Sequence, residues 1–565
     1  MAVAGADLVV RALELEGIRF AFGIPGTHNI ELYDALASSE QVRPILVTDE
    51  QSASFMADAA WRASGVMACV NVVPGAGLTH AMSGIAEAFL DCVPMLVLGC
   101  GIRRDSSMAW QLHDVDQRAI IAPVTKGTFR PEKGEEIVPI IRKACYLARH
   151  GRPGPVFVEI PANLYLFRHE DVRAQHEQTP TLIPPPEVKS AAELLTRSRR
   201  PLIYAGLGAA RAELVPLAER LEAPVATTFQ GKGVFPESHP LSLWPGYGAS
   251  APPFAQKIAG SCDVTLAIGC RFGEVGTGSY GAPPPGRLIH VDIDPDVPGR
   301  NYRAEVAIIA DAAAFVAALL ERLPPRGTDR DLREAIARGR EEARREIEAP
   351  SRDGVSPGRL LRALQERFGP QTIFTADSGN GTFIAVEALR LDKPGKLLAP
   401  VDYSCMGYAV PAAIGAKLAV PDAPVMALAG DGAFLMTGLE LLTAATHHTP
   451  VAVFLLHDRE LAQIAQFQSV AFGRKANSVL PDFDIESISR GVGVECFALN
   501  TDDEIRAAID RVAEVTSDGH PIVVDVRIDY SRRTFFTRGV VKTNLSRLPW
   551  KDRIRFVVRA VGRKI

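Results

Sequence analysis

The sequence has neither an excess of basic charge nor a long hydrophobic run. Lysine and arginine number 62 against 66 aspartates and glutamates, a formal net charge of −4, which argues against a strongly basic nucleic-acid-binding protein. No uninterrupted apolar stretch reaches the roughly 20 residues that span a bilayer, so we expect no transmembrane helix. The first residues carry acids early and no basic segment, so we expect no secretory signal.

Cysteine is scarce and is not arranged in pairs. The eight cysteines in 565 residues include no C-x-x-C spacing, and most of them lie in apolar runs. This pattern predicts neither a disulfide framework nor a zinc site. We interpret these cysteines as reduced, buried, small hydrophobic residues of a cytoplasmic protein.

Short apolar runs alternate with segments of helix length along the whole chain. The runs at 42–49 and 67–73, for example, are followed by helix-like segments at 50–65 and 78–91. This alternation predicts parallel sheets with crossover helices. One sheet would need too many strands, so we predict an α/β protein with several doubly wound parallel-sheet domains.

Two stretches mark the expected domain boundaries. The first is the proline-rich stretch 178–190, and the second is the charged segment 330–354, interpreted as a solvated connecting helix. We therefore predict domains at 1–180, 188–330 and 355–545, followed by a basic amphipathic tail at 546–565. The first and third domains could be distant structural copies, although no identity between them is visible.

The strongest local motif is Gly430-Asp431-Gly432, between an apolar strand and a helix-like segment. The next apolar strand ends in His457-Asp458-Arg459-Glu460. Carboxyl ends of neighbouring parallel strands meet at one sheet edge, where ligands bind. Asp431 and Asp458 could hold a hard cation such as Mg²⁺ there, and the glycines would let backbone N–H groups approach a phosphate. The alternative is a tight turn with an aspartate cap.

Three further segments carry candidate functional residues. Glu50 follows a strand and precedes a long helix-like segment, where a carboxylate is either a helix cap or a functional acid. Glycine-rich turns at 23–28 and 74–80 follow two other apolar runs. Each turn, taken alone, is also compatible with an ordinary loop.

Together these segments resemble the thiamine-diphosphate-dependent decarboxylases and carboligases, the family that includes acetolactate synthase. The resemblance covers nearly the whole chain through FGIPG, DEQSASFMADA, GAGLTHAMSGIAEA, TTFQGKGVFPESHPLSL and CMGYAVPAAIGA ahead of AGDGAF. It implies a pyrimidine-binding, a central and a diphosphate-binding domain. It also implies a homodimer or homotetramer with active sites between subunits.

The resemblance assigns a role to individual residues. Glu50 matches the glutamate that binds the aminopyrimidine ring, Met406 matches the apolar residue that bends the cofactor, and the backbone near Ser404 receives the 4′-amino group. The implied metal ligands are Asp431, Asp458 and the carbonyl of Glu460. The residues implied to line the diphosphate are Gly379, Asn380, Gly381, Gly430, Gly432 and Ala433.

This metal motif departs from the family pattern. Asp458 stands where the family has an asparagine ligand, and His457 stands where the preceding asparagine would be. Carboxylate oxygen can replace amide oxygen on Mg²⁺ but adds a negative charge. A shift by one residue, with His457 facing the metal, is the alternative.

The substrate pocket is less well defined. His28 follows the first glycine turn, and His113 stands where acetolactate synthases tend to have glutamine, with Gln111 and Gln117 as nearby alternatives. A histidine there could move protons. Phe467 and His80 replace a tryptophan and an asparagine of biosynthetic acetolactate synthases, which argues against that particular activity.

The resemblance implies decarboxylation of a 2-keto acid such as pyruvate, with or without ligation of the product to a second carbonyl. A 2-hydroxyacyl-CoA lyase or acyl-CoA decarboxylase is the alternative, and a non-catalytic protein is disfavoured by the retained Glu50, Asp431 and Met406. In the central domain, the turn at 206–211 lacks the third glycine of a dinucleotide fingerprint. Relatives bind FAD, ADP or nothing there. The basic tail would contact an anionic membrane surface or pack on the protein itself.

Overall fold

The computed structural model describes residues 2–170, 186–547, 549 and 550. The predicted proline-rich boundary and the predicted basic tail lie largely outside these residues. The described part forms three six-stranded parallel sheets and a small antiparallel pair, β1 (Ala2–Ala4) with β8 (Arg168–Glu170). The predicted α/β fold with doubly wound parallel-sheet domains is therefore confirmed. No described helix combines the length and apolar composition needed to cross a membrane.

The N-terminal domain has strand order β3-β2-β4-β5-β7-β6. Its strands are β2 (Phe20–Gly23), β3 (Arg43–Leu46), β4 (Cys69–Val72), β5 (Met95–Gly101), β6 (Thr128–Phe129) and β7 (Pro155–Pro161). Its helices are α1 (Gly5–Leu15), α2 (Ile30–Ala37), α3 (Glu50–Ser64), α4 (Ala76–Leu90), α5 (Gln117–Ile121), α6 (Ile137–Arg149) and α7 (Ala162–Leu166). The central strands β4, β5 and β7 are buried along their whole length, as expected where helices cover both faces of a parallel sheet.

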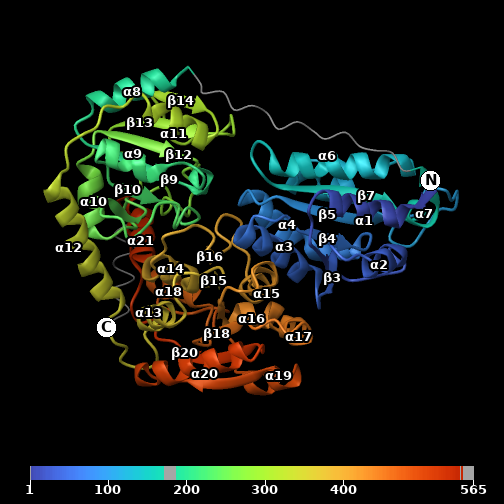
Figure 1. Cartoon of the computed structure of the whole chain (residues 1–565). Coiled ribbons are helices and arrows are strands. Elements are labelled where there is room, and N and C mark those ends of the chain that lie inside the picture. Colours follow the sequence, from blue (N-terminus) through green and yellow to red (C-terminus); the bar gives the residue numbers. More distant parts are fainter. Residues whose placement is uncertain (1, 171–185, 548, 551–565) are drawn as a thin grey trace.

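The central domain has strand order β11-β10-β9-β12-β13-β14. Its strands are β9 (Pro201–Ala205), β10 (Val225–Thr227), β11 (Ser242–Pro245), β12 (Val264–Ile268), β13 (Arg287–Asp292) and β14 (Val306–Ile309). Its helices are α8 (Val188–Arg197), α9 (Leu214–Leu221), α10 (Pro253–Gly260), α11 (Ala312–Leu320) and the long α12 (Arg330–Ile347). In Figure 1, α12 runs along the edge of the molecule from the central domain towards the C-terminal domain.

The C-terminal domain has strand order β16-β15-β17-β18-β20-β19. Its strands are β15 (Ile373–Ala376), β16 (Leu397–Leu398), β17 (Val425–Gly430), β18 (Ala452–His457), β19 (Glu495–Leu499) and β20 (Ile522–Arg527). Its helices are α13 (Pro357–Phe368), α14 (Asn380–Ala388), α15 (Ala409–Ala419), α16 (Asp431–Thr437), α17 (Leu441–Thr446), α18 (Ala462–Phe472), α19 (Ile485–Gly491), α20 (Ile505–Ser517) and α21 (Phe535–Arg547).

The N-terminal and C-terminal sheets have the same topology. Numbered from the first strand of each sheet, both follow the order 2-1-3-4-6-5, whereas the central sheet follows 3-2-1-4-5-6. The suggestion that the first and third domains are structural copies is therefore supported at the level of topology. Both orders place a ligand crevice where the winding reverses, at the carboxyl edge of the sheet.

The N-terminal and C-terminal domains share one hydrophobic core. A single buried cluster contains Phe55 and Ala59 of α3 together with Tyr408 and Ala412 at the start of α15. The two helices approach so closely that a Cβ on Gly415 would lie 2.3 Å from the carbonyl oxygen of Met56. Figure 1 shows α3 and α4 facing α15 and α16.

The expectation that the charged segment after the central domain is solvated on all sides is wrong. Leu332, Ile336, Gly339 and Ala343 form a buried stripe on α12. Their spacing of three and four residues places them on one helix face, and Phe254 of α10 packs directly on Gly339. Because arginine and glutamate dominate the segment, its composition alone does not reveal this narrow apolar stripe.

Helix α21 contributes Phe536 to a cluster of three phenylalanine rings. Phe536 stacks on Phe383 of α14, with ring centroids 4.1 Å apart, and meets Phe229 of the central domain at 5.1 Å. Further along α21, a Cβ on Gly539 would lie 2.3 Å from the carbonyl oxygen of Ala249. Helix α21 therefore joins the C-terminal domain to the central domain.

Candidate active site

Two carboxylates meet at the carboxyl edge of the C-terminal sheet, where β17 and β18 end. Asp431 begins α16; its Oδ1 accepts from the N–H of Gly432 at 2.7 Å and its Oδ2 from that of Arg459 at 2.6 Å. Asp458 follows β18, and its Oδ1 accepts from the N–H of Glu460 at 3.2 Å. The Glu460 side chain pairs with Lys475 instead of turning towards the two aspartates.

The charges of these two carboxylates oppose each other. Burial, and then the negative charge of Asp431, raise the pKa of Asp458 to about 7. Burial also raises the pKa of Asp431. Carboxylate oxygens are ligands that Mg²⁺ favours, and a divalent cation between them would offset the repulsion. The donor set therefore fits a magnesium ion.

His457 is turned to the side of this pair. Its Nδ1 lies 2.9 Å from Oδ1 of Asp525 on β20, and its Nε2 is buried without a partner among the described residues. The Asp525 carboxylate raises the pKa of His457. This arrangement supports Asp458 over His457 as the second carboxyl-edge ligand.

Glycines leave open space beside the two aspartates. A Cβ on Gly430 would meet no atom within 4 Å, and one on Gly381 would meet only atoms at 3.4 Å and beyond. Gly379, with φ of +120°, turns the chain into α14, which begins at the buried Asn380. Ala433 is buried in the first turns of α16. The N-terminus of α14 thus faces an open cradle of a kind that binds phosphate.

A left-handed turn carries Ser404 and Met406 over this cradle. Ser404 has φ of +68° and its Oγ lies 2.6 Å from the Oγ of Ser378. Behind the turn, Oδ1 of the buried Asp377 accepts from the N–H groups of Tyr408, at 2.7 Å, and of Ala409, at 3.1 Å. The Met406 side chain reaches over Gly432, with its Cε 3.6 Å from the position of a Cβ on that glycine.

Glu50 occupies the equivalent edge of the N-terminal sheet. The capping role falls to Asp49, whose side chain accepts from the N–H of Gln51 at 2.7 Å. The Glu50 side chain is only 9% exposed, yet no described residue donates a hydrogen bond to it at hydrogen-bonding distance. Gly77 makes room for it, because a Cβ there would lie 2.8 Å from Oε1 of Glu50. The structure therefore assigns the cap to Asp49, and a functional role of Glu50 stays a prediction.

His80 stands beside these acids. Its Nδ1 lies 3.6 Å from both Oδ2 of Asp49 and Oε2 of Glu50, and its side chain is 59% exposed. The imidazole ring of His80 therefore lies on the solvent-exposed side of Glu50.

The two predicted pocket histidines lie together. The rings of His28 and His113 are 5.4 Å apart between centroids. Burial, and then the neighbouring His113, lower the pKa of His28. Gln117, not Gln111, is buried against the second glycine turn, where its Oε1 accepts from the N–H of Gly75 at 3.1 Å. Among the described contacts, Gln111 contributes only its carbonyl oxygen, to the N–H of Asp114.

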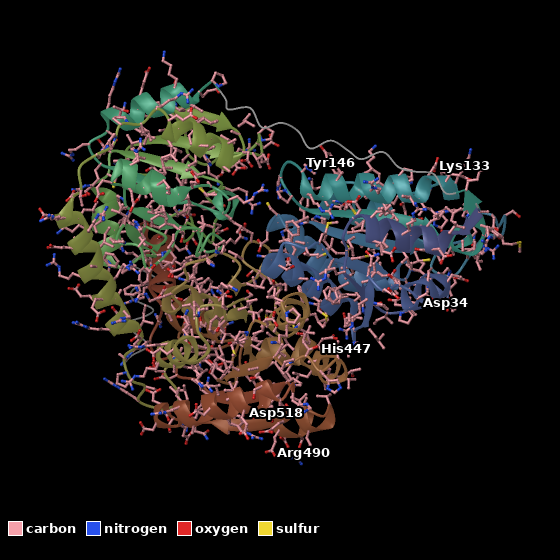
Figure 2. All side chains as sticks on the ribbon, in the orientation of Figure 1. Asp34, Lys133, Tyr146, His447, Arg490 and Asp518 are labelled. Carbon is pink, nitrogen blue, oxygen red and sulfur yellow. The ribbon has the colours of Figure 1, made fainter. Side chains whose placement is uncertain are left out.

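The two edges are held against each other by Glu440. Its carboxylate oxygens accept from both the N–H and the Oγ1 of Thr48, the latter at 2.7 Å, and from Oγ1 of Thr443. Thr48 lies two residues before Glu50, while Glu440 follows α16. Arg43 adds a hydrogen bond of 2.9 Å to His447, which Figure 2 shows at the boundary between the domains. These contacts hold the segment just before Glu50 against the segment that follows α16.

Comparison with known proteins gives three matches in chain order. They are the thiamine pyrophosphate enzyme N-terminal TPP binding domain over residues 3–120, its central domain over 188–319, and its C-terminal TPP binding domain over 377–526. The chain belongs to the thiamine pyrophosphate enzyme family. The predicted resemblance and the predicted thiamine diphosphate cofactor are thereby confirmed.

Curated relatives match this thiamine pyrophosphate enzyme along nearly its whole length. A probable acetolactate synthase large subunit of Methanocaldococcus jannaschii is 33% identical over 93% of this chain and 92% of its own. The acetolactate synthase large subunit of Corynebacterium glutamicum is 32% identical over 92% and 86%. The acetolactate synthase isozyme 3 large subunit of Escherichia coli is 29% identical over 94% and 96%.

Two polar residues near the site of this thiamine pyrophosphate enzyme, Asp377 and Glu440, are absent from the sequence prediction, and a third, Gln117, enters it only as an alternative. Asp377 directly follows β15, so its strand-end position was a usable signal. Glu440 lies in an ordinary helix-like segment, and nothing local in the sequence indicates that it contacts Thr48.

The central domain uses its glycine turn differently. The N–H of Gly208 donates to the carbonyl of Gly269 at 3.2 Å, and a Cβ on Gly206 would lie 2.1 Å from that oxygen. Close backbone packing therefore accounts for these glycines. Asp292, at the end of β13, caps the following turn through the N–H of Asp294 at 3.0 Å.

Proposed function

We propose that this thiamine pyrophosphate enzyme decarboxylates a 2-keto acid such as pyruvate and ligates the product to a second carbonyl compound. The observation that carries the proposal is the buried carboxylate of Glu50. It receives no hydrogen bond from a described residue and lies at the carboxyl edge of the N-terminal sheet, beside Gly77 and His80. Relatives named acetolactate synthase support the class of substrate.

The C-terminal edge would hold the cofactor and its metal. Asp431, Asp458 and the backbone carbonyl of Glu460 would bind Mg²⁺. Gly379, Asn380 and Gly381, together with the turn from Gly430 to Ala433, would bind the diphosphate. Met406 and the backbone near Ser404 would position the two rings.

The N-terminal edge would handle protons. Glu50 would hold a proton against the pyrimidine N1′, which favours the tautomer that serves as the base. Thiamine diphosphate, when bound, supplies the electron sink that allows a carboxyl group to leave as carbon dioxide. His28, whose lowered pKa favours the neutral ring, could accept a proton on a ring nitrogen, and His113 is placed to assist. Gln111 stays a predicted contributor to the same pocket.

The acceptor would differ from that of biosynthetic acetolactate synthases. Phe467 replaces the tryptophan that those enzymes use to select a second substrate, and His80 replaces an asparagine beside Glu50. We therefore keep the acceptor open between 2-keto acids and aldehydes. Acyl-CoA esters are the alternative substrate.

We further propose a homodimer or homotetramer with active sites between subunits, as the resemblance implies. In that arrangement, Glu50 of one subunit would complete the cofactor site that the C-terminal domain of another subunit provides. FAD or ADP in the central domain, cytoplasmic location and membrane contact by the basic tail stay predictions.

One screen tests the proposal. Purified protein with thiamine diphosphate and Mg²⁺ is offered pyruvate, other 2-keto acids and 2-hydroxyacyl-CoA esters, with carbon dioxide and products followed by mass spectrometry. The Glu50→Gln variant gives the background. Carbon dioxide release from a 2-keto acid is the expected result, whereas turnover confined to CoA esters would support the alternative.

A further inference from the structure

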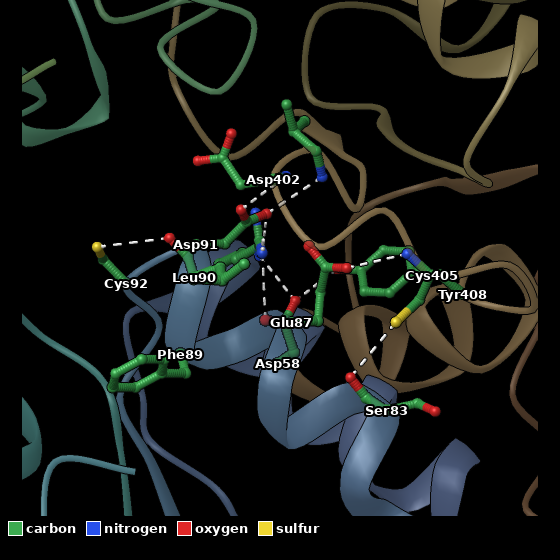
Figure 3. Close-up of polar contacts among 12 residues, drawn as sticks. Asp58, Ser83, Glu87, Phe89, Leu90, Asp91, Cys92, Asp402, Cys405 and Tyr408 are labelled. Carbon is green, nitrogen blue, oxygen red and sulfur yellow. Dashed lines mark hydrogen bonds and ion pairs between the residues drawn. The ribbon is translucent and has the colours of Figure 1, made fainter. Parts of the chain in front are cut away.

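A buried polar cluster joins the N-terminal and C-terminal domains directly behind the Ser404–Met406 turn (Figure 3). Arg62 of α3 contacts Asp58 at 2.7 Å and Asp91 at 2.9 Å. The Tyr408 hydroxyl, from the C-terminal domain, donates to Asp58 at 2.6 Å. Glu87 of α4 completes the cluster.

Glu87 holds the backbone of the turn. It is fully buried, and its Oε2 accepts from the N–H of Cys405 at 3.1 Å. The Cys405 thiol points to the carbonyl of Ser83, on the same helix, at 3.3 Å. Cys405 is the residue between Ser404 and Met406. The N-terminal domain therefore fixes the part of the C-terminal domain that is proposed to position the cofactor rings.

The charges in the cluster do not balance if every acid is ionised. Asp58 accepts from Arg62 and from Tyr408, and Asp91 accepts from Arg62 and from the N–H groups of Val401 and Asp402, so each carboxylate has several donors. Burial raises the pKa of Asp58, and the three hydrogen bonds that it accepts oppose that shift. Glu87 receives one backbone N–H. Its Oε1 is buried and accepts no hydrogen bond from a described residue. A buried carboxylate with only one hydrogen-bond donor is costly, so we assign a proton to the Glu87 carboxyl group.

We propose that Glu87 is a positioning residue held in its protonated form, with Oε2 accepting from Cys405 and Oε1–H donating to Asp91. The neutral carboxyl locks the Ser404–Met406 turn to α4. Its effect on the cofactor rests on the proposed function, whereas its protonation does not.

The electrostatic environment agrees with this geometry. Burial, and then the charge and the hydrogen bond of Asp91, raise the pKa of Glu87 to about 9, although Arg62 and the Cys405 N–H oppose the shift. The titratable and charged groups that act on Glu87 directly are Arg62, Asp91, Cys405 and Tyr408. Asp58, Asp402 and Arg271 surround Asp91. Arg271 is itself paired with Asp402.

The sign of the pH effect follows from this raised pKa. The closed state binds one more proton than an opened state between the ordinary glutamate pKa and about 9. The Glu87 contact is therefore fully stabilising at low pH and weakens as pH rises through that window. Each pH unit costs about tenfold in the opening equilibrium, or about 1.4 kcal/mol.

Hydrogen exchange in the Glu87→Gln variant tests the proposal. A glutamine copies a protonated glutamate, because its oxygen can accept from Cys405 while its amide donates to Asp91. We expect exchange at 399–409 to match the wild type at the lower end of this window, near the ordinary pKa of glutamate. As pH rises towards 9, the ratio of the wild-type rate to the variant rate should grow by about tenfold per unit. A flat ratio, or a variant that opens more at every pH, would overturn the proposal.

Glu440→Gln is the matched control. Glu440 is equally buried at the same domain boundary, but both its oxygens accept hydrogen bonds, including those from Thr48. An amide would turn a donor towards these donors, so this variant should open the boundary even near pH 6. If both variants behave alike, the interpretation of Glu87 as neutral is wrong.

Two further measurements separate this proposal from the proposed function. Difference infrared spectra of the wild type and Glu87→Gln should show the carbonyl band of a protonated carboxyl only in the wild type, whatever the activity. Calorimetry should show thiamine diphosphate affinity near wild type in Glu87→Gln and at least tenfold weaker in Glu87→Ala. A missing carboxyl band would refute the protonated Glu87, while a wild type that fails to bind thiamine diphosphate would refute only the proposed site.

Discussion

The two outer domains and the central domain are built from the same kind of sheet but differ at the carboxyl edge. The outer sheets share one strand order and one hydrophobic cluster, whereas the central sheet has another order and a cluster confined to residues 188–336. Each fold offers a crevice where the winding reverses. The difference shows that a doubly wound sheet supplies a place for a ligand, while the loops decide whether the place is used.

In the C-terminal domain those loops stay open beside Gly430 and Gly381, whereas in the N-terminal domain a Cβ on Gly23 would lie 2.0 Å from the carbonyl oxygen of Asn71. The crevice loops carry His28 and Gly75 in one domain and Gly379 and Asp431 in the other. At the corresponding point of the central domain, Gly206 packs on Gly269 so closely that the backbone itself fills the space. The predictions below test this contrast, starting from the change with the largest expected effect.

Asp431→Ala should abolish metal-dependent cofactor binding. Removing a direct ligand should exceed the 10–100-fold loss that is usual for outer partners of a metal site, so we expect more than about 100-fold weaker binding of thiamine diphosphate in Mg²⁺. Isothermal calorimetry measures the affinity. Unchanged affinity would place the metal elsewhere.

Glu50→Gln should leave cofactor binding nearly intact but lower turnover by a factor on the order of 10² or more, the scale of a lost proton transfer. Asp49 still caps α3, so the fold should be kept. Steady-state kinetics and calorimetry on the same preparation separate the two effects. Near-normal turnover would remove Glu50 from the mechanism.

Asp458→Asn should retain most of the activity, because an amide offers an oxygen at the same reach and relieves the repulsion with Asp431. Asp458→Ala should lose most of it. His457→Ala is the control, since the His457 ring is directed to Asp525. Metal titration of the stripped protein decides the matter: loss of activation in His457→Ala alone would contradict the ligand assignment.

Gly206→Ala should lower stability without changing turnover, whereas Gly430→Ala should weaken cofactor binding without changing stability. Of the variants in this series, Gly206→Ala has the smallest expected effect on turnover. A methyl group on Gly206 clashes with Gly269, so thermal unfolding should show a loss of roughly 1–3 kcal/mol with turnover per folded molecule unchanged. A methyl on Gly430 meets no atom within 4 Å, so stability should be kept while thiamine diphosphate binding weakens. Equal effects would erase the contrast between the domains.

The sequence was informative wherever one segment contains the whole signal. Alternating apolar runs predicted the three sheets, and the glycine-flanked Asp431 and the segment around Glu50 pointed to the carboxyl edges of the outer sheets. It was uninformative where contact depends on distant segments. No local motif near Glu440 indicates its contact with Thr48. None near Glu87 indicates its contact with Cys405, which lies 318 positions away. The stripe on α12 was hidden for another reason, since few large apolar residues mark it.

The cluster of three phenylalanine rings at α21 has a consequence for the order in which the chain is made. Phe229 and Phe383 leave the ribosome long before Phe536, which stacks between the surfaces that they belong to. Domains generally fold as units during synthesis. The sheets of the central and C-terminal domains can therefore form first and meet through direct contacts, such as the Leu391 N–H on Glu237 and Phe229 against Phe383. Helix α21 completes this interface when it emerges. A nascent chain that stalls before residue 535 would have folded sheets but lack α21. The faces of Phe229 and Phe383 that Phe536 covers in the complete chain would then be exposed.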